Sequence, residues 1–143
     1  MNTGFKLTYS TMFDPPPELH ERFEQALALI RGHLGGEHPM LIGGHDVRAP
    51  RQFAVRSPID TRDVLGRFQA GEDVHARDAV AAARRAFPAW ATTPWEERVR
   101  LLRRAVALIE ERVYFIGAAL ALEVGKNRME ALGEAQETAD LIA

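Results

Sequence analysis

The sequence of 143 residues contains no cysteine. The chain therefore has no disulfide, no thiolate nucleophile and no cysteine-ligated zinc or iron–sulfur centre. It also has no large excess of one charge, because 18 lysines and arginines stand against 20 aspartates and glutamates, for a formal net charge of -2. That balance gives no long-range attraction to nucleic acid or to an anionic membrane surface.

Long apolar runs are missing as well. No stretch approaches the roughly 18 uninterrupted apolar residues of a membrane span, and residues 1–17 contain no apolar segment of signal-peptide length. We therefore expect a cytoplasmic protein with no membrane partner. The hydrophobic content of 46% is enough for one compact globular domain.

Motifs for nucleotides and metals are also missing. The glycine pairs at 35–36 and 43–44 lack G-x-G-x-x-G spacing and do not join a strand to a helix, so we predict no cofactor-binding residue in this chain. The histidines include no i, i+4 pair on a helix, so we predict no metal site. His45 and Asp46 are expected to stabilise a turn and not to form a catalytic dyad. We interpret every histidine as a surface or turn residue: His20, His33, His38, His45 and His75.

The first part of the chain divides into three segments. Residues 1–13 show no period and are expected to form an extended arm. A helix is predicted over residues 14–36, with Asp14 as its N-cap, prolines in its first turn and Gly35-Gly36 as its stop. Residues 39–71 form short β-prone runs at 40–42, 53–55 and 64–68, and Gly43-Gly44 predicts a tight hairpin. We expect a small antiparallel β region that depends on another element for its core.

Residues 73–143 are helical in composition. Thr93, Pro94 and Glu96 predict a helix start, with Thr93 as N-cap and Glu96 in a capping box. A bend is predicted near Gly117 and a break at Gly125. Trp90 and Trp95 are spaced as core-packing residues, without the interleaved basic residues of a nucleic-acid platform.

A last helix is predicted from near Met129, and it carries three carboxylates. Glu130, Glu134 and Glu137 are spaced by four and three residues, which places them on one face, with Lys126 one turn before Glu130. Pattern alone favours a solvated acidic stripe. No stop signal precedes Ala143, so we interpret the chain as incomplete there.

Five motifs in order resemble the N-terminal part of the NAD-dependent aldehyde dehydrogenases. Each motif is weak alone, but their order and spacing match over residues 39–143. The helix at 14–36 and the EVGKN segment are most similar to the L-glutamate γ-semialdehyde (1-pyrroline-5-carboxylate) dehydrogenases. The motifs are PMLIGG from Pro39, Ser57-Pro58, ARRAFPAW from Ala83, Trp95-Glu96-Glu97-Arg98, and LEVGKN from Leu122.

The resemblance implies an α/β parent enzyme with a Rossmann-type cofactor domain, of which this chain is a mainly α-helical part with a small antiparallel β region. It implies that NAD and the catalytic cysteine, glutamate and asparagine belong to parts of the enzyme outside this chain, so no catalytic residue is expected here. It also implies a small aldehyde substrate, contact with the remainder of the enzyme, and a homo-oligomer when complete. Glu137 matches a glutamate near the aldehyde site and is the one expected substrate-binding residue.

Two departures from the family pattern lie in the β region. His45-Asp46 stands where many relatives have Glu-Trp, and Ser57-Pro58 stands where many have Asn-Pro. They weaken the subfamily assignment more than the fold assignment. Two alternatives therefore stay open: another NAD(P)-dependent aldehyde dehydrogenase, or a stand-alone helical module that binds a protein partner without catalysis.

Overall fold

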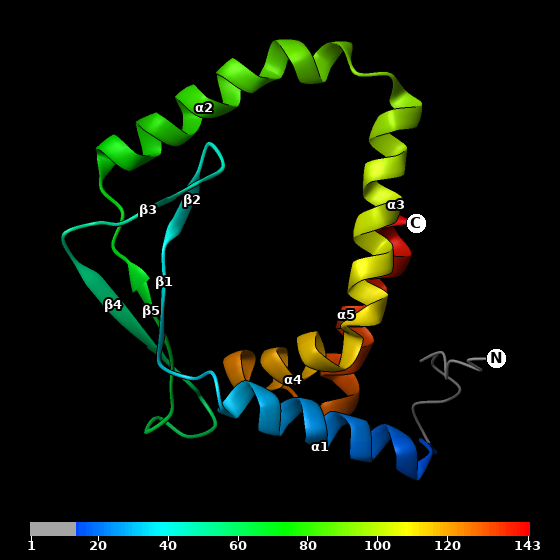
Figure 1. The fold of residues 1–143 in the computed structure, drawn as a ribbon. Coiled ribbons are helices and arrows are strands. Elements are labelled where there is room, and N and C mark those ends of the chain that lie inside the picture. Colours follow the sequence, from blue (N-terminus) through cyan, green and yellow to red (C-terminus); the bar gives the residue numbers. More distant parts are fainter. Residues whose placement is uncertain (1–13) are drawn as a thin grey trace. The chain divides into compact units, whose positions relative to one another are not determined.

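The structure is a computed structural model that describes residues 14–143 (Figure 1). The predicted extended arm at residues 1–13 lies outside the described residues. The chain divides into two compact units. The described residues of the first unit are 14–33 and 100–143, and the second unit is Leu34–Val99.

The first unit is helical, and α4 lies at its centre. This helix contacts both α1 and α5, which come from opposite ends of the sequence. The core between these helices consists of side chains that are less than a tenth exposed: Leu19, Phe23, Ile30, Ala118, Ala121, Leu122, Ala131, Leu132, Ala135 and Ala139. The helices of this unit are α1 (Pro17–Arg31), α3 (Trp95–Glu111, whose first residues belong to the second unit), α4 (Val113–Val124) and α5 (Arg128–Ile142).

The predicted α1 helix is confirmed, but its predicted ends are wrong. Pro16, and not Asp14, is the N-cap, with φ -66° and ψ 150°. A proline disfavours helical backbone in the residue before it, so the helix begins only at Pro17, the last of the three prolines. At the other end the helix stops at Gly32, before the predicted Gly35-Gly36 stop.

The helical segment after α2 (Asp73–Thr92) breaks where α3 meets α4, and not at Gly117. Arg112 has φ -109° and ψ 15°, and it separates α3 from α4. Gly117 is buried inside α4, where a Cβ atom would lie 2.8 Å from Cδ2 of Leu132. This glycine therefore permits close approach of α5 and does not bend the helix. The predicted break at Gly125 is confirmed, because this residue ends α4 with φ 77°.

The start of α3 also differs from the prediction. The hydroxyl of Thr93 donates a 2.9 Å hydrogen bond to the carbonyl oxygen of Ala89, so it stabilises the end of α2 (Asp73–Thr92). Thr93 is therefore not the N-cap of α3, which begins at Trp95. A side-chain cap is found instead at the start of α2, where the backbone N–H of Glu72 donates to Nδ1 of His75 over 2.9 Å.

The second unit contains two small sheets. In the first, β5 (Val64–Gln69) lies between β1 (Gly36–His38) and β4 (Gln52–Arg56), parallel to β1 and antiparallel to β4. The second sheet is the predicted hairpin, with β2 (Met40–Ile42) and β3 (His45–Val47) joined by Gly43-Gly44. Both glycines have positive φ, 61° and 85°, as a two-residue hairpin turn requires. The expected β region is thus confirmed, but it is not wholly antiparallel, because β1 pairs parallel to β5. The strand β1 was not predicted.

The long helix α2 of the second unit has no buried residue. Trp90 at its end is 48% exposed and Trp95 is 63% exposed, so the expected packing of both tryptophans into a core is wrong for the described residues. Helical spacing indicates which face is apolar, but it does not show that a covering element lies within the same unit. No helix within residues 14–143 combines the length and apolar character needed to cross a bilayer.

A candidate substrate-contacting face on α5

The orientation of α5 is fixed by its N-cap and by its buried stripe. Asn127 is the N-cap, and its side-chain oxygen accepts a 3.0 Å hydrogen bond from the N–H of Glu130. The buried stripe follows helical spacing and packs against α4; it comprises Ala131, Leu132, Ala135 and Ala139. Glu130 and Glu137 are consequently exposed, and Glu134 is half-buried at the edge of the stripe.

A hollow of about 340 Å³ lies beside this stripe, within the first unit. Aliphatic side chains from α3, α4 and α5 form most of its wall, and two carboxylates of α5 complete it. Glu130 is not among the lining residues, although the sequence placed it on the same face. The lining residues are Ile109, Ile116, Leu120, Glu134, Ala135, Glu137, Thr138 and Leu141.

The two carboxylates of the hollow differ in their partners. Glu134 forms an ion pair with Nζ of Lys126, whereas the sequence placed Lys126 beside Glu130. Glu137 forms no hydrogen bond or ion pair with any residue in the range 14–143. The arrangement therefore presents one uncompensated carboxylate at an apolar wall, which suits a ligand with an ammonium group or another hydrogen-bond donor.

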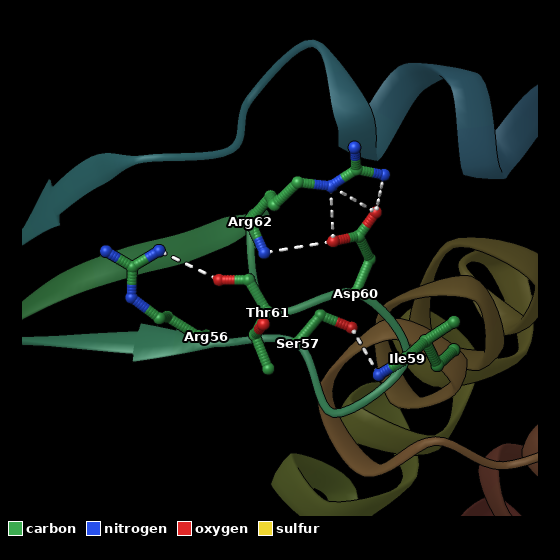
Figure 2. Close-up of polar contacts among 6 residues, drawn as sticks. All are labelled: Arg56, Ser57, Ile59, Asp60, Thr61 and Arg62. Atoms are coloured by element: carbon green, nitrogen blue, oxygen red, sulfur yellow. Dashed lines mark hydrogen bonds and ion pairs between the residues drawn. The ribbon is translucent and has the colours of Figure 1, made fainter.

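A second polar cluster lies in the loop between β4 and β5 (Figure 2). The guanidinium of Arg62 donates to both carboxylate oxygens of Asp60, with Nη2 to Oδ2 at 2.6 Å and Nε to Oδ1 at 2.9 Å. These bonds, with a backbone bond from Arg62, hold the pKa of Asp60 below its usual value, and they raise the pKa of Arg62. Arg56 donates to the carbonyl oxygen of Thr61 over 2.8 Å.

These contacts close the loop on itself, and Ser57 adds to them by accepting a 3.2 Å bond from the N–H of Ile59. Because these polar side chains are used in contacts within the loop, we assign the loop a structural role. A similar exposed pair lies near β1, where Arg48 donates to Glu37 over 2.6 Å. Hydrogen bonds from Arg48 and then from Gln52 lower the pKa of Glu37.

Four of the five histidines contact residues of their own turn, helix end or sheet, whereas His20 belongs to a longer-range cluster described below. His33 contacts the carbonyl oxygen of Leu29 at 2.8 Å, and His75 caps α2. His38 stacks on Phe68 with ring centroids 4.8 Å apart. His45 and Asp46 pair with opposite residues of the hairpin, and no hydrogen bond joins their side chains. Within the described part of the chain, no three histidine or carboxylate residues cluster as a metal site would require.

One polar cluster of the first unit was not predicted from the sequence. Arg128 at the start of α5 forms an ion pair with Glu24 of α1, and its Nη1 lies 2.7 Å from Nδ1 of His20. Its guanidinium also lies 4.7 Å from the ring centroid of Phe23. More than 100 residues separate these partners. No local pattern could have indicated the contact, because i, i+4 rules act only within one helix.

Comparison with known proteins defines the class of protein. Residues 46–143 match the model of the aldehyde dehydrogenase family. The chain belongs to this family.

The individual proteins similar to this chain are named for a narrower group within the family. The chain is 33% identical over 142 residues to 1-pyrroline-5-carboxylate dehydrogenase 2 of Bacillus subtilis (strain 168), covering 99% of this chain and 27% of the relative. A 1-pyrroline-5-carboxylate dehydrogenase of Bacillus pumilus is 32% identical, with the same coverage of both chains.

Solved structures agree with these relatives. The 1-pyrroline-5-carboxylate dehydrogenase from Thermus with bound NAD matches with a TM-score of 0.88 and 31% identity, over 96% of this chain and 26% of that one. The Mycobacterium tuberculosis enzyme bound with NAD and cobalamin matches with a TM-score of 0.83 and 26% identity, over 91% and 25%. The chain thus spans about a quarter of the length of the relatives it matches.

Proposed function

We propose that this chain is part of an NAD-dependent oxidoreductase that converts L-glutamate γ-semialdehyde to L-glutamate in proline degradation. The observation that carries the proposal is the similarity along 99% of the chain to a relative named for 1-pyrroline-5-carboxylate. The reaction takes an aldehyde, water and NAD⁺ to a carboxylate, NADH and two protons. Family membership and an NAD-bound structural relative support the reaction type and the cofactor.

The residues described do not themselves fit NAD. A pyrophosphate is held by a glycine-rich turn that leads from a strand into the N-terminus of a helix. Here β5 leads into α2 through Ala70, Gly71 and Glu72, and the N-cap of α2 is the glutamate. A carboxylate at that position would repel a phosphate. NAD binding, and the cysteine thiolate that attacks the aldehyde in this family, are therefore assigned to residues outside this chain.

Within this chain we assign a positioning role to Glu137. Its carboxylate lines the α5 hollow beside aliphatic side chains and has no partner among residues 14–143. Such a group can hold the ammonium group of the substrate or order a polar site beside its carbonyl. It would increase the rate by orienting the aldehyde and not by making or breaking a bond.

The test is the Glu137→Ala substitution in the complete enzyme. We expect kcat/KM for glutamate semialdehyde to fall roughly ten- to a hundredfold, which corresponds to about 1.4 to 2.7 kcal/mol of lost transition-state stabilisation. Glu130→Ala is the matched control, because it removes an exposed carboxylate of the same helix that does not line the hollow. Negligible effects of both substitutions would mean that Glu137 is only part of a solvated acidic stripe and does not position the substrate.

A second assay tests the division of roles between this chain and the rest of the enzyme. Purified residues 1–143 should show no NAD-dependent aldehyde oxidation, because the chain has no cysteine, and no measurable NAD affinity, because it has no glycine-rich loop to hold the phosphates. Oxidation of glutamate semialdehyde by residues 1–143 alone would contradict the proposal.

A further inference from the structure

The hollow on α5 has an unusual charge arrangement that neither the family match nor Glu137 alone explains. Glu134 and Glu137 are three residues apart on one helix, so their carboxylates are neighbours that repel each other. The one ion pair at this hollow, among residues 14–143, joins Lys126 to Glu134. Lys126 therefore neutralises Glu134 and leaves the carboxylate of Glu137 available to a ligand.

The backbone fixes the position of Lys126. Gly125 before it ends α4 in the left-handed conformation, with φ 77°, and Asn127 after it caps α5. Between these two residues the side chain of Lys126 is only 29% exposed, and that of Glu134 is 44% exposed. Because both side chains are partly buried at the α4–α5 turn, solvent and salt screen this ion pair less than a pair on an open surface.

We infer that Lys126 is a specificity-determining residue: by neutralising Glu134 it leaves Glu137 as the one uncompensated carboxylate of the hollow, and so sets how strongly the hollow prefers an aldehyde with an ammonium group over a neutral one. This inference rests on the proposed role of Glu137. Lys126, Glu134 and Glu137 together carry a charge of minus one, which complements a single ammonium group. Lys126 acts through Glu134 and does not need to touch the substrate.

The expected size of the effect follows from Coulomb's law. One unit charge about 6 Å from the ammonium group, in surroundings between bulk water and a protein surface, changes its binding roughly three- to tenfold. Steady-state kinetics of the complete enzyme can resolve a change of this size.

The experiment is a double-mutant cycle in the complete enzyme, with KM and kcat measured for glutamate semialdehyde. Glu134→Gln keeps the shape of the side chain but leaves the lysine uncompensated, so KM should rise about three- to tenfold. Lys126→Met leaves two free carboxylates, so KM should fall about three- to tenfold. In the double variant the net charge is again minus one, and KM should return to within about twofold of the starting enzyme.

Controls separate charge from structure. Values of kcat should change less than about twofold, because the reacting groups lie outside this chain. A neutral aliphatic aldehyde of the same chain length should show the same KM in all four enzymes, and Lys126→Arg should resemble the starting enzyme. KM changes of the same sign in the two single variants, a double variant whose KM stays well away from that of the starting enzyme, or equal KM changes with the neutral aldehyde would overturn the inference.

The outcomes also distinguish this inference from the proposed function. If Glu137→Ala has no effect, the proposed role of Glu137 fails, and the inference fails with it. If Glu137→Ala is harmful but Glu134→Gln and Lys126→Met do not shift KM in opposite directions, only the role of Lys126 fails.

Discussion

The two units of the chain are stabilised in different ways. Among the described residues, every buried apolar side chain of the core belongs to the first unit. The buried polar side chains, Ser57 and Gln69, both belong to the second unit. The first unit is therefore held together by side-chain packing, whereas the second depends on hydrogen bonds and on backbone geometry at turns.

This difference explains where each unit tolerates change. In the first unit α4 and α5 approach so closely that a side chain added at Gly117 would clash with Leu132. In the second unit Gln69 accepts a 3.0 Å bond from the N–H of Ala49 and donates a 3.2 Å bond to the carbonyl oxygen of His38. It thus connects β5 to β1 and to the segment before β4.

The largest expected effect tests the packed unit. Leu132 is 2% exposed, so Leu132→Ala removes buried apolar area and leaves a cavity between α4 and α5. We expect the free energy of unfolding to fall by about 2 to 5 kcal/mol, measured by urea denaturation.

Phe53→Ala is the comparison in the second unit, because that side chain is 52% exposed although it lies on a strand. Its cost should be well below that of Leu132→Ala, since little area is buried. Equal losses from the two substitutions would mean that the second unit also has an apolar core.

A smaller effect should come from the buried glutamine of the second unit. Gln69→Ala leaves the N–H of Ala49 and the carbonyl oxygen of His38 without their partner. We expect a loss of about 1 to 3 kcal/mol in stability, together with faster amide exchange in β1 and β5. Faster exchange confined to α4 and α5 would contradict the assignment of Gln69 to the second unit alone.

Sequence reasoning succeeded where a feature depends on near neighbours. Gly43-Gly44 and Gly125 have the positive φ that the sequence predicted for a turn and a helix end. Sequence reasoning failed where a feature depends on contacts between residues that are far apart in the sequence. The strand β1 lacks an apolar alternation and exists through its pairing with β5, about 30 residues away. The spacing of apolar residues along α2 likewise does not show whether another surface covers them, and none of them is buried.

The candidate site was predictable only in part. The spacing of Glu134 and Glu137 indicated a shared helix face, and the resemblance singled out Glu137. The pairing of Lys126 with Glu134 across the α4–α5 turn required the structure, because it depends on the path of the chain through Gly125 and Asn127. The role of Glu137 itself stays a prediction.

The smallest expected effect concerns pH and the hydrogen-bonded loop of the second unit. Arg62 lowers the pKa of Asp60, so the folded state favours the ionised carboxylate. The resulting stabilisation is present above the unfolded pKa, about 3.9, and is lost as pH falls through the lower pKa of the folded state. The carboxyl carbon resonance of Asp60 should therefore titrate below the midpoint of an unperturbed aspartate, and Arg62→Ala should return it to the ordinary value. The change in overall stability should be small, because Arg62 is largely exposed, Asp60 is half-buried and solvent screens the pair. A midpoint that does not move in Arg62→Ala would show that the Asp60–Arg62 pair does not hold the loop.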